Sequence, residues 1–279
     1  MSLKHFARKY LREGALPTTF CAGCGLGIIM NCFLKAVEEL GHSNLDDFIF
    51  CSGIGCTAWI PSPHFKADSI HTLHGRSIAV AFGVKMVRPE HHVVVFGGDG
   101  DIAGIGIGHL IHAAKRNLEI LVIMANNFNY AMTGGQLSPT TPLGSLTITS
   151  PYGNIERPLD VVKVMDASGA SFVARWTTYH VIPLIRTIKA ALNKKGFSFI
   201  EVISQCPTIF GRRAGFKSTY DMLKYFKEHS IPIERAKGMD EKELEDKFVV
   251  GIFTDRERVG YTTLYKQVVE RAQKKYEAV

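Results

Sequence analysis

A glycine-rich turn that contains an acid is the pattern in this sequence best suited to do chemistry. The turn spans residues 97–101 (GGDGD) and follows the apolar run Val93–Phe96. Glycines between a strand and a helix let backbone N–H groups approach a phosphate. Because an acid repels a bare phosphate, Asp99 implies a cation between the two. Mg²⁺ binds carboxylate and phosphate oxygens together, so the turn predicts a Mg²⁺-diphosphate site.

Two asparagines, Asn126 and Asn127, follow the next apolar run, Ile120–Met124. Parallel strands deliver their carboxyl ends to one edge of a sheet, so Asp99 and Asn127 can face the same ion. The alternative is a nicotinamide or flavin Rossmann fold, because residues 98–103 (GDGDIA) fit the loose GxGxxA pattern. That fold needs an acid at the end of the following strand, whereas Glu119 stands at its start. The asparagines therefore favour the Mg²⁺-diphosphate site.

Four of the six cysteines are candidate metal ligands. A CxxC pair, Cys21 and Cys24, lies in a glycine-rich turn, Cys56 follows Gly55, and Cys206 precedes a proline. Four thiolates suit an iron–sulfur cluster or a structural zinc, and both remain open, although a single CxxC is less typical of zinc. The other two thiols, which we expect to pack in the interior, are Cys32 and Cys51.

Short apolar runs that alternate with helix-like segments must position these residues. The predicted strands are 48–51, 92–96, 120–124 and 197–203, and the predicted helices are 26–40, 77–86, 101–115, 160–167 and 181–192. Continuous apolar strands alternating with helices predict an α/β fold, a parallel sheet with helices on both faces. Residues 129–157 are too long for an ordinary connection, which indicates an ordered functional loop. We expect this α/β domain over residues 1–210, and a charged helical C-terminal tail over 211–279 that packs on the same domain or on a partner.

Composition limits the classes of function. The 279 residues are 46% hydrophobic and 21% charged, as in ordinary soluble proteins. No apolar run reaches the roughly 20 residues of a membrane span, and residues 1–16 lack the apolar core of a secretory signal. We therefore expect a cytoplasmic protein with reduced thiols. The net charge of +7 is spread along the chain without an aromatic-interleaved stripe, which suits anionic cofactors or an acidic partner better than nucleic acid.

Two motifs carry a resemblance to a known family. Gly98-Asp99-Gly100, then 25 residues, then Asn126-Asn127 resembles the thiamine-diphosphate motif. Together with the cysteine pattern, it makes residues 15–215 similar to the β subunits of 2-oxoacid:ferredoxin oxidoreductases, including those of 2-oxoglutarate type. The resemblance implies a thiamine-diphosphate-binding fold in which Mg²⁺ is held by the side chains of Asp99 and Asn127 and the carbonyl of Asn129. It also implies a [4Fe–4S] cluster on Cys21, Cys24, Cys56 and Cys206.

Two further segments match that family. The resemblance implies that His74 and Arg76 lie near the thiamine as catalytic residues. It also implies that a loop over residues 130–142 covers the cofactor, although many relatives have glycine at the position of Ala131. The cofactor-binding residues that it implies are Ile54, Gly55, Cys56, Thr57, His74, Gly98, Asp99, Gly100, Asp101, Asn127, Ala131 and Met132.

The resemblance implies one subunit of a coenzyme A-acylating enzyme that passes electrons from a 2-oxoacid to ferredoxin. Thiamine enzymes need a glutamate from a second domain, which implies an α subunit, with small γ or δ subunits possible. The alternatives are a non-oxidative thiamine-dependent decarboxylase or synthase subunit, and a basic zinc-binding nucleic-acid module. The substrate stays open: the apolar residues 57–61 (TAWIP) favour an apolar side chain, whereas residues 133–141 are similar to 2-oxoglutarate-type chains.

Overall fold

The computed structural model describes residues 5–277 and is built on an eight-stranded sheet. The strand order is β2-β1-β3-β4-β6-β5-β8-β7. The bounds are β1 Phe48–Ser52, β2 Asp68–His71, β3 His92–Gly98, β4 Ile120–Asn126, β5 Phe172–Thr177, β6 Ser198–Ile203, β7 Ser230–Pro232 and β8 Phe248–Asp255. Every neighbouring pair is parallel except β5 and β8, which run antiparallel. The parallel sheet predicted from the sequence is thus confirmed for six strands, and two further strands at one edge, β8 and β7, run antiparallel to those six.

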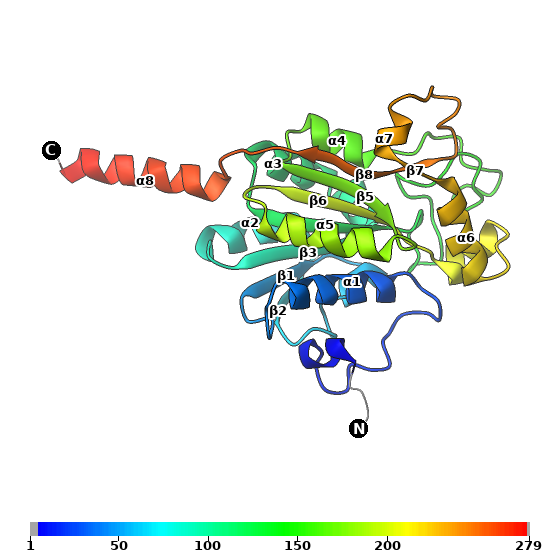
Figure 1. The fold of residues 1–279 in the computed structure, drawn as a ribbon, viewed down its shortest axis with the longest axis horizontal. Helices are drawn as coiled ribbons and strands as arrows, with labels where there is room; N and C mark the ends of the chain where they lie inside the picture. The colour runs from blue at the N-terminus through cyan, green and yellow to red at the C-terminus, as the bar shows by residue number, and fades with distance from the viewer. Residues whose placement is uncertain (1–4, 278–279) are drawn as a thin grey trace.

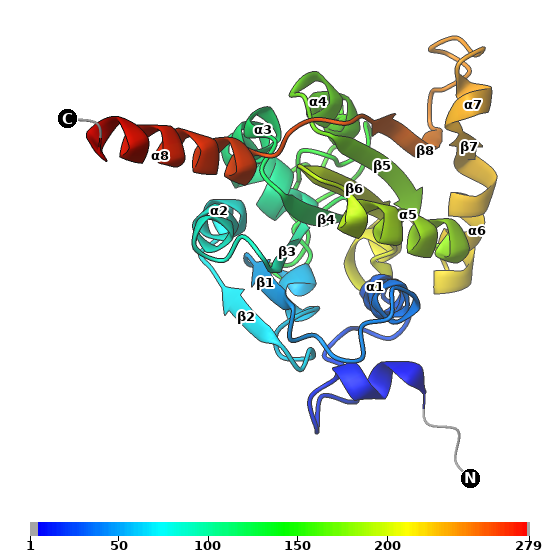
Figure 2. The same cartoon turned by 60° about the vertical axis from the view of Figure 1, so that its left-hand side comes forward.

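Helices cover both faces of this sheet, as Figures 1 and 2 show. On one face α1 (Leu26–Glu39) and α5 (Val181–Asn193) share a core with the side chains of Phe50 and Phe96. On the other face α2 (Ser77–Val87), α3 (Ile107–Arg116) and α4 (Val161–Ala167) bury the opposite side of the same strands. β4 is buried along its whole length because both layers cover it.

The segment predicted as one helix over residues 101–115 is broken in the structure. A single wide turn, Gly100–Ile105, follows β3, and α3 begins only at Ile107. Gly104 has φ −85° and ψ −108°, outside the helical region. Because residue 104 is a glycine, the backbone can leave the helical conformation there, and the prediction of a continuous helix was wrong for that reason.

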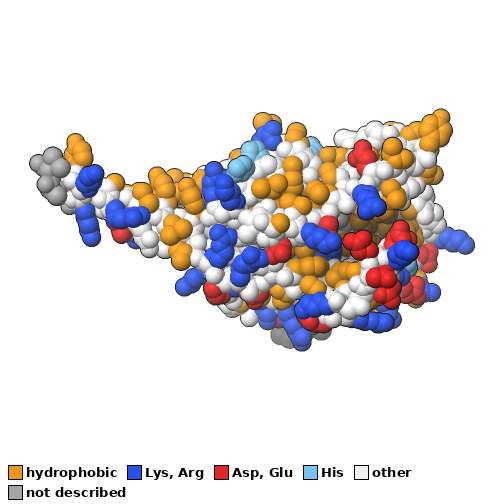
Figure 3. All heavy atoms as spheres, turned by 90° about the horizontal axis from the view of Figure 1, so that it is seen from above, with side chains coloured by type: hydrophobic (Ala, Val, Ile, Leu, Met, Phe, Trp, Pro, Cys, Tyr) orange, Lys and Arg blue, Asp and Glu red, His pale blue; other side chains and the backbone are white. Residues whose placement is uncertain are grey.

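The segment after residue 210 contains strands as well as helices. The turn Pro207–Gly211 leads into α6 (Thr219–His229), which is followed by β7, α7 (Ile233–Ala236), β8 and α8 (Tyr261–Glu277). β8 joins the main sheet beside β5, a role that the sequence analysis missed. The helical C-terminal end is confirmed by α8, which projects away from the body with hydrophobic and basic side chains along it (Figures 1 and 3). Among residues 5–277 no helix is long and apolar enough to cross a membrane.

Candidate active site

The predicted site residues gather at one edge of the sheet. They lie on the loops that follow the carboxyl ends of β1, β3, β4 and β6, on the short loop between β2 and α2 and, for Cys21 and Cys24, in the turn before α1. Neighbouring strands are in register there: Gly98 of β3 pairs with Ala125 of β4, and Asn126 pairs with Ile203 of β6. This is the edge at which open α/β sheets bind ligands.

Asp99 is buried at the centre of this edge, with an exposed fraction of 1%. Its Oδ2 accepts hydrogen bonds from Ser138 Oγ at 2.5 Å and from Thr140 Oγ1 at 2.7 Å. Its Oδ1 accepts a long hydrogen bond from the backbone N–H of Asn127 at 3.5 Å. The hydroxyls therefore fix one carboxylate oxygen and turn the other toward Asn127.

Three oxygens converge at this point: Oδ1 of Asp99, the amide oxygen of Asn127 and the carbonyl oxygen of Asn129. The amide oxygen of Asn127 lies 3.2 Å from Asp99 Oδ1 and 2.7 Å from the carbonyl oxygen of Asn129. Without a cation, these oxygens repel one another, and rotating the Asn127 amide would replace the contacts with two hydrogen bonds. With a cation between them, the same orientation supplies three ligands of the type that Mg²⁺ takes. The Oδ1 atom of Asn129 is also buried without a hydrogen-bond partner. The residues present therefore fit Mg²⁺.

Burial raises the pKa of Asp99 to about 6, against the opposing effect of hydrogen bonds from Ser138 and Thr140. The cause is desolvation, because a buried carboxylate loses its hydration when it is charged. A dication at the converging oxygens would favour the charged form. The carboxylate is thus placed where a bound cation, rather than water, would stabilise it.

Gly100 leaves room for an aromatic ring against the turn. A Cβ at this position would lie 2.3 Å from Cε1 of Tyr130. The Tyr130 hydroxyl also donates a hydrogen bond to the Gly100 carbonyl at 3.2 Å. The absence of a side chain therefore allows the loop after β4 to close over the loop after β3.

Asp101 ties the neighbouring loops to this turn. Its Oδ1 accepts hydrogen bonds from the N–H groups of Gly75 at 2.6 Å and Ile54 at 3.4 Å. His74 Nδ1 lies 2.8 Å from the same oxygen, but without the alignment of a hydrogen bond. A Cβ on Gly53 would lie 2.0 Å from Oδ2 of Asp101. Asp101 thus positions the loops that carry Ile54 and His74.

The remaining predicted residues lie on these same loops. Arg76 is exposed, and its guanidinium donates to the carbonyls of Gly75 at 3.3 Å and Ile105 at 3.5 Å. These contacts join the two loops, while the predicted catalytic role of Arg76, like that of His74, stays a prediction. Thr57 is buried, and its hydroxyl lies 3.6 Å from where a Cβ on Gly98 would stand. Met132 is exposed by 44% beside the half-buried Ala131 in the loop after β4, and Gly55 has a left-handed φ of 123°.

The four candidate cysteines lie within electrostatic reach of one another. Burial raises the pKa of the Cys24 thiol to about 12, and three neighbouring thiols add to this increase. Those neighbours are Cys206, Cys56 and Cys21. Cys24 also lies in a turn that is hydrogen-bonded to the chain before Cys206, since Gly25 N–H donates to Gln205 O at 3.0 Å.

These thiols are not arranged around one ion. Among residues 5–277, no three His, Cys, Asp or Glu side chains gather as ligands of a single metal. Zinc in a four-thiolate site requires each sulfur at about 2.3 Å from the same centre. In a four-iron cluster each thiolate binds a different iron, so the sulfurs stand further apart. The [4Fe–4S] cluster on these four cysteines therefore stays a prediction, as does the zinc alternative. The two cysteines expected to pack in the interior, Cys32 and Cys51, are buried as predicted.

Comparison with known proteins decides the family. A model described as "Thiamine pyrophosphate enzyme, C-terminal TPP binding domain" matches residues 53–202. The chain is 52% identical over 267 residues to 2-oxoglutarate synthase subunit KorB of Methanocaldococcus jannaschii, covering 96% of this chain and 98% of the relative. It is 36% identical over 271 residues to the 2-oxoacid:ferredoxin oxidoreductase β subunit of Saccharolobus solfataricus, covering 91% and 86%. The chain belongs to the family of 2-oxoacid:ferredoxin oxidoreductase β subunits.

A solved structure supports the assignment of the chain to this family. It is the 2-oxoglutarate:ferredoxin oxidoreductase from Magnetococcus marinus with 2-oxoglutarate, coenzyme A and succinyl-CoA bound. The TM-score is 0.84 at 31% identity, covering 97% of this chain and 92% of that chain. The similarity therefore extends well beyond residues 15–215, the range expected from the motifs, and includes most of the segment after residue 210.

The polar network behind the Asp99 site of this β subunit was not predicted from the sequence. Asn126 Nδ2 donates to Glu201 Oε1 at 2.7 Å, and Arg175 Nε donates to Glu201 Oε2 at 2.6 Å. Arg175 also reaches Asp160 Oδ1 at 2.5 Å. The Asn126 amide oxygen in turn lies 2.8 Å from Oγ1 of Thr140, whose one hydroxyl proton can be donated either to Asn126 or to Asp99. Three hydroxyl residues lie close together at Ser138, Thr140 and Thr141, but nothing in the local sequence pointed to their partners or to Arg175.

Proposed function

We propose that this β subunit, joined to an α subunit, converts 2-oxoglutarate, coenzyme A and two oxidised ferredoxins to succinyl-coenzyme A, CO₂, a proton and two reduced ferredoxins. The observation that carries the proposal is the convergence of the oxygens of Asp99, Asn127 and Asn129 at the sheet edge that also holds four thiols. Cys56 links the two groups, because its neighbour Thr57 packs against Gly98 of the diphosphate turn.

The residues of this chain would hold three cofactors: Mg²⁺, thiamine diphosphate and an iron–sulfur cluster. Asp99, Asn127 and the Asn129 carbonyl would bind Mg²⁺, and the glycines of residues 97–100 would let the backbone approach the diphosphate. Thiamine diphosphate supplies the centre at which carbon dioxide leaves a 2-oxoacid. Cys21, Cys24, Cys56 and Cys206 would hold a [4Fe–4S] cluster, which accepts electrons singly. Ser138 and Thr140 keep the Asp99 carboxylate turned toward the metal position.

The choice of 2-oxoglutarate is supported by two observations. The M. jannaschii relative, at 52% identity, is named a 2-oxoglutarate synthase subunit. Most of the apolar residues 57–61, which favoured an apolar substrate, are buried: Ala58 is exposed by 1% and Ile60 by 0%, and only Trp59 is half-buried. Ile60 packs in the core beneath α1. The buried residues therefore give no reason to exclude a substrate with a second carboxylate.

Viologen reduction by the complex tests the proposal. The β subunit is co-expressed with its α subunit, purified without oxygen, and supplied with coenzyme A and a panel of 2-oxoacids. We expect 2-oxoglutarate to give a kcat/KM at least about tenfold above that of pyruvate, the ratio that one extra binding interaction provides. Reduction with none of the 2-oxoacids would refute the oxidative function, and a preference for pyruvate would refute the substrate assignment.

A cysteine pair tests the cluster. Cys24→Ser should lower the iron and labile-sulfide content of the complex by one cluster and abolish viologen reduction. Cys51→Ser is the matched control, because Cys51 is fully buried in the interior on β1 and has no proposed ligand role. Equal iron content in the two variants would contradict the assignment of Cys24.

A further inference from the structure

The first turn of α6 borders the place where the cysteine turn reaches the surface. A Cβ on Gly23 would lie 2.2 Å from Thr219 Oγ1, so residues 21–24 pack directly against the start of α6. Cys21 is exposed, and Gly23 beside it is also exposed. Gln205 Nε2 donates to the Gly23 carbonyl at 3.2 Å and thereby joins this turn to the chain before Cys206. Two candidate cluster ligands and α6 thus meet at one point on the surface.

The segment from Cys206 to the end of α6 is basic. Its exposed cations are Arg212, Arg213, Lys217, Lys224 and Lys227, against the acids Asp221 and Glu228. Asp221 accepts a hydrogen bond at 2.9 Å from the hydroxyl of Ser218, the residue that caps the start of the helix, and Glu228 lies 3.8 Å from Lys224. In the described part of the chain, no acid lies within salt-bridge distance of Lys217 or Lys227. Their charges are therefore available to a partner.

Two of these cations, Lys224 and Lys227, share a face of α6 with exposed aromatic side chains. Tyr220, Lys224 and Lys227 are spaced by four and three residues, which places them on one side of α6. Tyr220 is exposed by 72%. Lys227 Nζ lies 5.8 Å from the ring centroid of Tyr179, which is itself exposed by 43%. Basic side chains around a small aromatic patch are typical of surfaces that bind partners transiently through charge.

Acidic residues lie on a different flank of α6. Asp246, in the acidic stretch of residues 240–246, is close enough to Tyr225 to add to the rise of its pKa, which burial causes first. Tyr225 is turned away from Tyr220, Lys224 and Lys227 by more than a quarter of a helical turn. An acidic partner would therefore be attracted to one side of α6 and repelled from the other, which fixes its orientation.

We propose that this surface, defined by Lys217, Tyr220, Lys224 and Lys227 together with the exposed turn at Cys21, is where ferredoxin docks as an acidic electron acceptor. The proposal rests on the proposed function, because it requires a cluster on the cysteines. Exposed charges act over about 10 Å at 0.1 M salt, so the surface would speed the encounter and make it salt-dependent. A partner held there would stand beside the turn that carries Cys24 and Cys21, of which Cys21 is the exposed one among the four proposed ligands.

Charge reversal in the assembled enzyme tests the docking surface. The variant Lys217→Glu/Lys227→Glu is compared with Lys274→Glu/Lys275→Glu, which makes the same charge change on α8 at the opposite end of the molecule (Figure 1). Each complex is assayed with 2-oxoglutarate and coenzyme A, using first an acidic ferredoxin and then methyl viologen as electron acceptor. Both assays are repeated from about 0.05 to 0.5 M salt, a range over which the screening length falls severalfold.

We expect the α6 variant to lose about tenfold or more in kcat/KM for ferredoxin at low salt, with a weaker salt dependence. Its viologen rate should equal that of the parent, and the α8 variant should match the parent with both acceptors. Equal losses with ferredoxin in the α6 and α8 variants, or no loss in either, would overturn the docking surface. A parent complex that does not reduce viologen would instead refute the proposed function itself.

Discussion

Arg175 should be among the most costly residues to replace, because it balances a carboxylate buried between two central strands. Glu201 on β6 has a side chain exposed by only 2%, and Arg175, its cross-strand partner on β5, by 12%. In Arg175→Met, the carboxylate of Glu201 would keep only the hydrogen bond from Asn126. Removing one partner of a buried ion pair costs about 3–5 kcal/mol, chiefly because the remaining charge stays desolvated.

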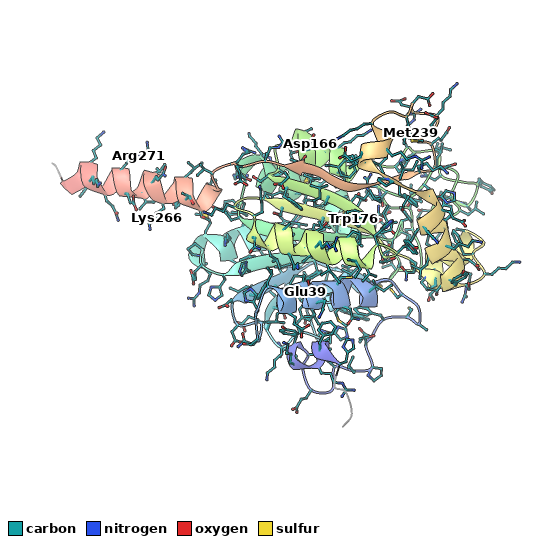
Figure 4. The ribbon with its side chains drawn as sticks, viewed as in Figure 1. Glu39, Asp166, Trp176, Met239, Lys266 and Arg271 are labelled. Carbon is teal, nitrogen blue, oxygen red and sulfur yellow. The ribbon has the colours of Figure 1, made fainter. Side chains whose placement is uncertain are left out.

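The assay is urea unfolding followed by tryptophan fluorescence, to which Trp176 next to Arg175 contributes (Figure 4). At pH 8 we expect the free energy of unfolding of Arg175→Met to fall by about 3–5 kcal/mol. The double variant Arg175→Met/Glu201→Gln should recover most of this loss, because it removes both charges. Lys163→Met is the control, since Lys163 is 83% exposed and lies 3.7 Å from Asp160, so its loss should be within about 1 kcal/mol.

The double variant separates charge from packing, because it keeps the methionine and removes the unpaired carboxylate. A deficit of Arg175→Met below about 1 kcal/mol at pH 8, or one that adding Glu201→Gln does not reduce, would refute the reasoning.

Two further changes test the site. Ser138→Ala removes a hydroxyl that donates to Asp99 and should weaken Mg²⁺-dependent binding of thiamine diphosphate by about 10–100-fold in calorimetric titration; unchanged affinity would contradict the role given to this hydroxyl. Gly100→Ala forces a Cβ to within 2.3 Å of the Tyr130 ring and should lower the free energy of unfolding by about 1–3 kcal/mol. Gly108→Ala on α3, where a Cβ meets nothing within 4 Å, should instead gain up to about 1 kcal/mol, and similar results for both glycines would be inconsistent with this packing.

The parts of the fold that could be predicted have a signal in the local sequence. β3 and β4 are runs of apolar residues covered on both faces, and α1 has apolar residues at helical spacing. The edge strand β2 is mostly exposed and polar, so it carries no such signal. β5 was missed because Arg175 interrupts it. Its charge is balanced by Glu201 on β6 and Asp160 before α4, and such pairings across the fold are not visible in one segment.

Other differences also depend on tertiary contacts. β8 includes Gly251 at φ 140° and pairs with β5 across an irregularity in register, within a stretch whose flanks are charged. The break before α3 occurs at Gly104, and the preceding Asp101 binds the loops that carry Ile54 and Gly75. A contact between residues 26 positions apart leaves no periodic pattern in the sequence.

The candidate site was predictable where chemistry restricts residue types. An acid in a glycine turn and asparagines after the next strand are needed together for a metal and a diphosphate, and the structure brings the oxygens of Asp99 and Asn127 within 3.2 Å. Ser138 and Thr140 could not be assigned in advance, because hydroxyl residues are common in loops. Only the fold of residues 129–157 shows that two of them face the carboxylate of Asp99.

Titration of the assembled complex with thiamine diphosphate, with and without Mg²⁺, tests the central claim most directly when the parent is compared with Asp99→Asn. The substitution keeps the size of the buried side chain and removes its charge. We predict Mg²⁺-dependent binding to the parent and a loss of at least about 100-fold in the variant, because outer partners of metal ligands alone account for 10–100-fold. Asp46→Asn, on an exposed loop, should bind as the parent does. Equal affinity in Asp99→Asn and the parent, or parent binding that does not need Mg²⁺, would contradict the account.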